Sequence, residues 1–98
     1  MSSSRQLAAI LFADIVGYTG LMQEDEANAL ALLQKLRKKL EEVVAHHRGR
    51  ILEFRGDGAL CRFSSTLESV RAAIALQLDM QSEPRVPLRI GLHTGDII

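Results

Sequence analysis

The chain has 98 residues, which is enough for one domain and too few for two. Its 12 basic and 12 acidic side chains give zero net charge, so there is no electrostatic reason to expect a nucleic-acid or anionic-membrane partner. Hydrophobic residues make up 47% of the chain, which excludes disorder, and neither a membrane-spanning apolar run nor a second cysteine is present. We therefore expect a single cytoplasmic domain over residues 1–98, with residues 1–6 as a loose tail.

The first half of the chain predicts a strand followed by a long helix. Residues 7–13 form a continuous apolar run that is too short for a typical helix, which favours a central strand covered on both faces. Residues 25–48 predict a helix, because apolar side chains recur there at spacings of three and four. The apolar positions expected to face the core are Ala27, Leu30, Leu33, Leu36, Leu40, Val43 and Val44.

Two short strands joined by a turn are expected after the helix. Residues 50–54 and 59–63 are strand candidates, and the segment between them, Arg55-Gly-Asp-Gly58, is rich in turn residues. Cys61 lies within the second of these strands, where we expect it to be a small apolar core residue.

A second helix and a last strand complete the chain. Ser65 and Glu68 have the spacing of a capping box, which predicts a helix that begins there. Its inner face is expected to consist of Leu67, Val70, Ile74 and Leu78. Residues 82–87 contain two prolines and predict a loop. The alternating apolar residues of the expected last strand are Leu88, Ile90 and Leu92.

The element order β-α-β-β-α-β predicts an α+β, ferredoxin-like fold, in which an antiparallel sheet carries both helices on one face. In this topology the third strand pairs antiparallel beside the first. Asp14 follows the first strand, and Asp57 directly precedes the third. We therefore expect these two aspartates, which are distant in sequence, to lie close together.

Two neighbouring carboxylates repel each other unless a cation compensates their charge. Mg²⁺ is suited to such a site, because it binds a few carboxylates together with waters and phosphate oxygens. Residues 15–20 include two glycines between a strand and a helix, so their backbone N–H groups could bind phosphate. The pattern alone leaves a simpler interpretation open, because an aspartate at a strand end is usually a turn or cap residue, and Gly-Asp-Gly is usually a hairpin turn.

Three motifs resemble those of class III adenylate and guanylate cyclases. The segment Phe12-Ala-Asp-Ile-Val-Gly-Tyr-Thr19 looks like the first metal-binding motif of that family, and Gly56-Asp-Gly58 resembles the second. The segment Arg89-Ile-Gly-Leu-His-Thr-Gly-Asp96 is similar to the strand that follows the second helix. The motifs occur in the family's order and spacing, so the chain resembles the N-terminal half of a cyclase catalytic domain.

The resemblance implies a two-metal reaction that converts ATP or GTP into a 3′,5′-cyclic nucleotide and pyrophosphate for intracellular signalling. By this resemblance Asp14 and Asp57 are catalytic and hold two Mg²⁺ or Mn²⁺ ions, with the carbonyl of Ile15 as a further ligand. The family's phosphate-binding amides correspond to those of Val16, Gly17, Tyr18 and Thr19.

Glu53 bears on the choice of substrate. Adenylate-specific members commonly carry a lysine four residues before the second metal-binding aspartate, and this chain has Glu53 there. Guanylate cyclases often have glutamate at this position, because a carboxylate can accept hydrogen bonds from guanine. The resemblance therefore makes Glu53 a purine-selecting residue and leaves ATP or GTP open. The alternative is that Glu53 simply faces solvent on an edge strand.

The family builds its active site between two subunits, and a later segment supplies a second purine-selecting residue, an asparagine and an arginine. The 98 residues do not include that segment, so we expect this chain to be inactive alone and to form a homodimer or otherwise self-associate. Two alternatives stay open. One is a degenerate cyclase-fold module that binds nucleotide or a partner domain without chemistry, and the other is a plain ferredoxin-like interaction domain.

Overall fold

The computed structural model describes residues 6–97 and contains four strands and three helices. Residues 1–5 of the expected tail lie outside the described residues, and Gln6 already belongs to the first strand. None of the helices in the described part is both long enough and apolar enough to cross a membrane. In chain order the elements are β1 (Gln6–Ile15), α1 (Tyr18–Glu24), α2 (Glu26–His46), β2 (Gly49–Arg55), β3 (Gly58–Phe63), α3 (Thr66–Met80) and β4 (Leu88–Ile97).

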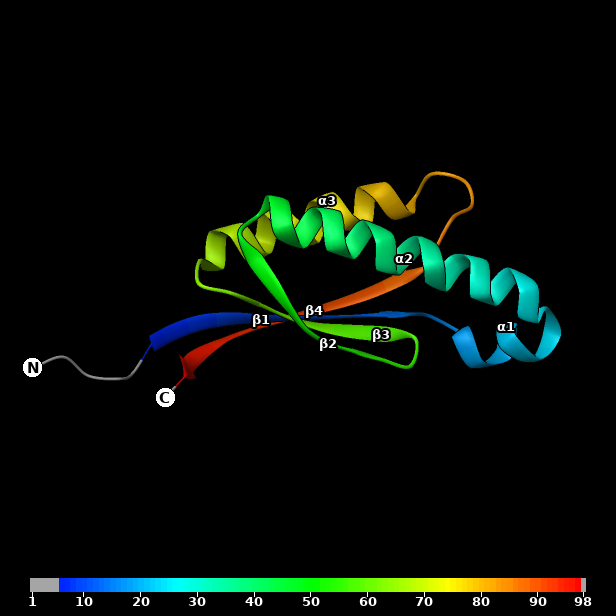
Figure 1. The fold of residues 1–98 in the computed structure, drawn as a ribbon, viewed down its shortest axis with the longest axis horizontal. Coiled ribbons are helices and arrows are strands. Elements are labelled where there is room, and N and C mark those ends of the chain that lie inside the picture. Colours follow the sequence, from blue (N-terminus) through cyan, green and yellow to red (C-terminus); the bar gives the residue numbers. More distant parts are fainter. Residues whose placement is uncertain (1–5, 98) are drawn as a thin grey trace, which may run out of the picture.

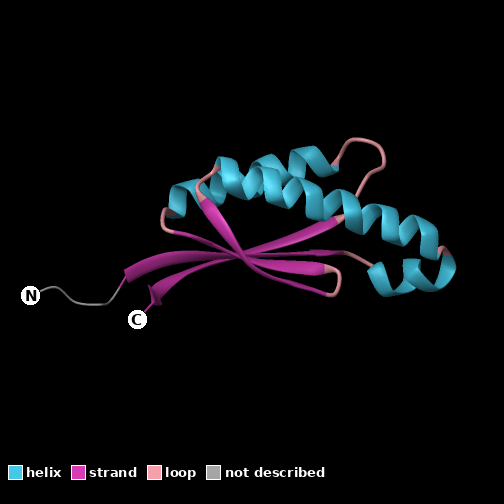
Figure 2. Cartoon of the chain, in the orientation of Figure 1, coloured by secondary structure: helices cyan, strands magenta, loops and turns pink. Residues whose placement is uncertain are grey.

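The four strands form one antiparallel sheet in the order β2-β3-β1-β4. Helices α2 and α3 lie over the same face of this sheet, and the short helix α1 lies at one end of it (Figure 1). Within residues 6–97 no helix lies over the opposite face, as the two-layer arrangement in Figure 2 shows. The predicted α+β, ferredoxin-like fold is confirmed. The prediction that β1 is covered on both faces is wrong, because Phe12 on the helix-free face is about half exposed.

Helix α1 is an element that the sequence pattern did not predict. None of its residues is buried, so it lacks the apolar stripe by which a helix is recognised in a sequence. The long helix does begin where expected, because the carboxylate of Asp25 accepts a hydrogen bond from the backbone N–H of Asn28 and caps α2. It ends at His46, slightly earlier than predicted, and Arg48 adopts a positive φ of 60°.

The prediction for the inner face of α3 is wrong. Leu67, Val70, Ile74 and Leu78 are 57%, 39%, 56% and 61% exposed. The residues of α3 that are buried are Ser69, Ala72, Leu76 and Met80. This helix carries two stripes at helical spacing, and the small side chains of Ser69 and Ala72 in the buried stripe allow the helix to pack closely at those positions. The polar Ser69 is accommodated because its hydroxyl donates a 2.6 Å hydrogen bond to the carbonyl of Thr66.

Helix α2 follows the prediction over most of its length. Leu36, Leu40, Val43 and Val44 are buried as expected. Near its beginning the buried positions are Ala29 and Leu32 instead, whereas Ala27 and Leu30 are exposed.

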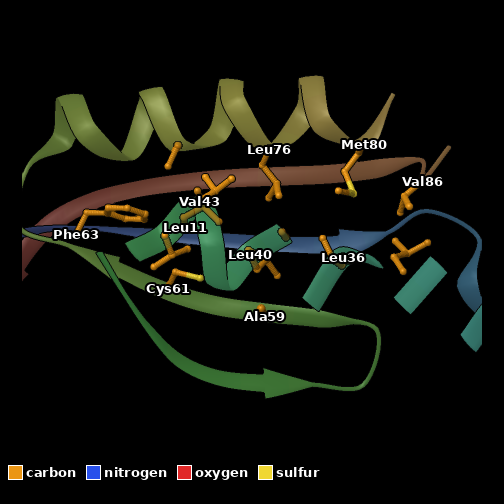
Figure 3. Packing of buried hydrophobic residues seen from close by; sticks show 14 of the residues in the cluster. Leu11, Leu36, Leu40, Val43, Ala59, Cys61, Phe63, Leu76, Met80 and Val86 are labelled. Atoms are coloured by element: carbon orange, nitrogen blue, oxygen red, sulfur yellow. The ribbon is translucent and has the colours of Figure 1, made fainter. Parts of the chain in front are cut away.

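The core lies between the sheet and the two long helices (Figure 3). Leu11 of β1 and Phe63 of β3 face the helices, as does Cys61, which is fully buried. Burial raises the pKa of the Cys61 thiol to about 11, because the charged thiolate would lose its hydration. The expectation that Cys61 is a core residue is therefore confirmed.

Candidate functional site

The end of β1 and the turn between β2 and β3 meet at one end of the sheet. Asp14 is paired with Gly58 in the β1–β3 ladder, and the backbone N–H of Ile15 donates a 3.3 Å hydrogen bond to the carbonyl of Asp57. Paired Cα atoms in an antiparallel ladder are at most about 5.5 Å apart, so those of Asp14 and Asp57 are within about 9 Å of each other. The predicted convergence of these two segments is confirmed.

Two glycines shape the turn that carries Asp57. Gly56 has a φ of 52°, which a residue with a side chain rarely adopts. A Cβ atom on Gly58 would lie 2.6 Å from the carbonyl oxygen of Ala13 and 3.1 Å from the Cβ of Asp14. The Gly-Asp-Gly segment is therefore a hairpin turn, as the simpler interpretation held, and its last glycine also lets β3 pack closely against Asp14.

A pocket of about 440 Å³ opens at this end of the sheet. Both aspartates and Glu53 contribute to its wall, so three of the predicted site residues lie around one cavity. The residues that line it are Phe12, Ala13, Asp14, Glu53, Arg55, Gly56, Asp57, Gly58, Ala59 and Leu60.

The carboxylate of Asp14 is held by an arginine from the neighbouring strand. Arg89 lies opposite Asp14 in the β1–β4 ladder, and its Nε and Nη2 atoms donate hydrogen bonds of 3.1 Å to Oδ1 and Oδ2. The hydrogen bonds to Asp14 and its negative charge raise the pKa of the Arg89 guanidinium, and the charge of Asp57 adds to this effect. The carboxylates of Asp14 and Asp57 therefore both act electrostatically on the guanidinium of Arg89.

Sequence reasoning did not single out Arg89 as a functional residue. The available signal was its position at the start of the last strand. In the predicted topology that strand is antiparallel to the first, so its beginning lies beside the end of the first strand, where Asp14 is.

Glu53 is on the edge strand β2 and is partly exposed, so it lines the pocket and also faces solvent. The Nε and Nη2 atoms of Arg55 both lie 3.0 Å from its Oε2 atom. This pairing holds the Glu53 carboxylate from one side.

The loop after β1 is arranged differently from the expectation. The backbone N–H of Val16 donates a 2.9 Å hydrogen bond to the carbonyl of Pro87, so it is already engaged within the chain. Gly17 has a φ of 73° and precedes α1, and its carbonyl accepts the first hydrogen bond of that helix from Leu21. Tyr18 and Thr19 begin α1, where amides have no acceptor within the helix. None of these residues lines the pocket described above.

The whole chain, residues 1–98, matches the family model described as the adenylate and guanylate cyclase catalytic domain. The chain belongs to this cyclase family. The class III cyclase resemblance of the three sequence motifs is thereby confirmed.

Relatives of known name agree with the cyclase assignment. The protein named "Putative adenylate cyclase 3" from Rhizobium meliloti (strain 1021) is 40% identical over 105 residues, which cover 99% of this chain and 18% of that protein. The solved adenylate/guanylate cyclase/hydrolase from Silicibacter pomeroyi is 35% identical with a TM-score of 0.74, and the guanylyl cyclase Cya2 is 26% identical with a TM-score of 0.79. Each comparison covers 98% of this chain, which spans 60% and 57% of those two chains.

The donor atoms at this candidate site suit a hard divalent cation. Within residues 6–97 no three histidine, cysteine, aspartate or glutamate side chains gather into a metal cluster. The candidate donors are the carboxylates of Asp14 and Asp57, which line the pocket, and the carbonyl of Ile15, a residue that is not among those lining it. All of them are oxygens. Mg²⁺ and Mn²⁺ are commonly bound by one or two carboxylates with waters and substrate phosphates completing the coordination. The guanidinium of Arg89 already pairs with the Asp14 carboxylate, so a divalent cation would have to share this carboxylate with Arg89.

Proposed function

We propose that this chain carries the metal-binding half of a class III nucleotidyl cyclase active site. The complete enzyme would convert ATP or GTP into a 3′,5′-cyclic nucleotide and pyrophosphate for intracellular signalling. The observation that supports this most directly is that Asp14 and Asp57, from the two metal-binding motifs, line the same pocket. Because nucleoside triphosphates are intracellular metabolites, we place this activity in the cytoplasm.

Asp14, Asp57 and the Ile15 carbonyl would hold two Mg²⁺ or Mn²⁺ ions. When bound, the ions would lower the pKa of the ribose 3′-hydroxyl and offset negative charge on the departing pyrophosphate. The chain's own contribution is positioning. Asp14 is fixed by its ladder pairing with Gly58, and the carbonyl of Asp57 is fixed by the hydrogen bond from Ile15. Such preorganisation spares the site the cost of assembling its charges during the reaction.

The triphosphate would be bound beside this site by backbone amides of the loop after β1. Of the four amides in the expected set, those of Gly17, Tyr18 and Thr19 are at the beginning of α1, where no helical acceptor competes for them. The amide of Val16 would have to leave the carbonyl of Pro87 before it could contribute.

Glu53 would select the purine. Because Arg55 engages Oε2, the other carboxylate oxygen stays available to accept a hydrogen bond from an N–H group of guanine. The position therefore supports GTP as the first substrate to test against ATP.

The complete active site would require a second subunit. No asparagine is among the residues that line the pocket, and an apolar stripe on α3 is exposed beside the edge strand β4. We therefore propose that the 98 residues do not turn over nucleotide alone and that the chain associates as a homodimer or with another cyclase-fold partner.

The test is Mn²⁺-dependent binding of GTP and ATP, measured by calorimetry with the wild-type chain and two variants. Asp14→Asn should abolish the metal-dependent part of binding, whereas Asp79→Asn on α3, an equivalent change away from the pocket, should leave it unchanged. Binding that is independent of metal and of Asp14 would refute the proposed site. A complete protein that binds nucleotide in this manner but never forms cyclic product would instead be a non-catalytic module.

A further inference from the structure

The guanidinium of Arg89 makes a two-point contact with the carboxylate of Asp14, one of the candidate metal ligands. Its Nε and Nη2 atoms each donate to a different oxygen of Asp14 at 3.1 Å, so neither oxygen of this carboxylate is free of the guanidinium. The parallel fork is the strongest geometry by which arginine binds a carboxylate. In the structure, Asp14 is therefore already neutralised from within the chain.

The pair is built by the register of the sheet. Arg89 of β4 is directly opposite Asp14 of β1, and Gly58 of β3 is opposite Asp14 on the other side. Asp14 thus lies between β4, which carries the guanidinium of Arg89, and β3, which begins directly after Asp57.

Arg89 would oppose the binding of a divalent cation at Asp14 in two ways. The fork occupies lone pairs on both oxygens of Asp14, and its positive charge lies where it repels a metal ion. The contact is nevertheless reversible, because the side chain of Arg89 is 74% exposed and that of Asp14 is 38% exposed. A pair this accessible to water is weak enough to be exchanged.

We propose that Arg89 is a positioning residue that competes with the divalent cation for Asp14, so that the chain binds metal more weakly with Arg89 than without it. This inference rests on the proposed metal site at Asp14 and Asp57. Arg89 fixes the Asp14 carboxylate when no metal is bound and has to loosen its two-point contact when a metal binds.

The experiment measures Mn²⁺ binding to the chain in the absence of nucleotide, by the electron paramagnetic resonance signal of free Mn²⁺. Arg89→Gln should bind Mn²⁺ roughly fivefold more tightly than the wild type, which is the scale of an exposed, two-point ion pair. Arg89→Lys, which keeps the charge and loses the fork, should fall between the two. Arg55→Gln is the matched control. It removes an arginine that lines the pocket beside Asp14 but pairs with Glu53, and it should change the Mn²⁺ affinity by less than about twofold.

Several results would overturn the inference. Unchanged or weaker Mn²⁺ binding by Arg89→Gln, with binding still abolished by Asp14→Asn, would reject competition and leave the metal site intact. An equal gain in Mn²⁺ affinity for Arg55→Gln would show that the effect comes from the loss of any positive charge near the site and not from competition for Asp14. The absence of Mn²⁺ binding in every protein at millimolar concentration would reject both the inference and the proposed site.

A second measurement is independent of whether the Arg89 variants fold. In the wild-type chain, the ¹⁵Nε–H signal of Arg89 should shift as Mg²⁺ is titrated, since the hydrogen bond to Asp14 is lost or weakened. The same signal in Asp14→Asn should not respond to Mg²⁺. An Arg89 signal that stays constant in the wild type while Mg²⁺ saturates the site would overturn the inference.

Discussion

Arg37 of α2 donates a 3.3 Å hydrogen bond from Nη2 to the carbonyl of Gly56, the residue before Asp57. Its guanidinium also lies 5.1 Å from the centre of the Phe54 ring on β2. One side chain thereby connects the long helix with the turn that carries the second candidate metal ligand. The position of Asp57 relative to Asp14 consequently depends on packing between the helix layer and the sheet.

Replacing Arg37 with methionine should loosen this turn. The hydrogen bond and the cation–π contact are both lost, so we expect the free energy of unfolding to fall by about 1 kcal/mol. Urea denaturation followed by circular dichroism measures this change. Lys38→Met is the control, because Lys38 is an exposed neighbour on the same helix. Equal denaturation midpoints for the two variants would show that Arg37 does not stabilise the turn.

Gly58→Ala should separate the strands at the candidate site. The added Cβ would lie 2.6 Å from a backbone oxygen of β1, which cannot move without disturbing the β1–β3 ladder. We expect destabilisation of roughly 1–3 kcal/mol, the usual range for overpacking, together with loss of Mn²⁺ binding. Thermal denaturation and the Mn²⁺ titration measure the two effects.

Gly20→Ala provides the comparison for that substitution. A Cβ at Gly20 would meet no atom within 4 Å beyond the neighbouring residues and backbone of its own helix, and the residue lies in α1, where alanine favours the helix. This variant should be as stable as the wild type or slightly more so. If both alanine variants had the same stability, the close approach at Gly58 would have no energetic importance.

The two apolar stripes of α3 should respond differently to truncation. Leu76 is 1% exposed and packs in the core, so Leu76→Ala should cost about 2–5 kcal/mol. Leu78 is 61% exposed, and Leu78→Ala should change the stability of the monomer by less than about 0.5 kcal/mol. Chemical denaturation at low protein concentration makes the comparison. A larger loss for Leu78→Ala would mean that the opposite stripe faces the core.

Glu68 should make stability depend on pH in the acidic range. The hydrogen bond from His47 at 2.8 Å and the positive charge of Arg71 lower the pKa of the Glu68 carboxyl group. Because the folded-state pKa lies below the unfolded one, the stabilisation is fully present above the unfolded value of about 4.3 and is lost as pH falls through the folded value. The difference in melting temperature between the wild type and Glu68→Gln should therefore shrink below about pH 4.

Glu42→Gln is the control for that pH series. Glu42 forms only a 3.7 Å ion pair with Lys39 on the exposed side of α2, so its effect should be small at every pH. A constant difference between wild type and Glu68→Gln down to pH 2 would contradict the role of Glu68.

The sequence by itself determined the order of the elements apart from α1, the approximate ends of most of them and the identity of the family. Alternation, helical spacing and caps such as Asp25 and Ser65 depend on residues a few positions apart, so they can be read from local pattern. The meeting of Asp14 and Asp57 was also predictable, because the topology of the fold places the ends of their strands together.

Only the tertiary structure decided which surfaces pack and which charges pair. Helix α3 has two apolar stripes of similar spacing, and the choice of the one containing Leu76 depends on how closely the helix approaches the sheet. The contact between Arg89 and Asp14 depends on the register of two strands at opposite ends of the chain. The hydrogen bond between Val16 and Pro87 likewise joins two loops that are far apart in the sequence. Such contacts are set by the summed packing of the whole domain, which no local spacing of residues encodes.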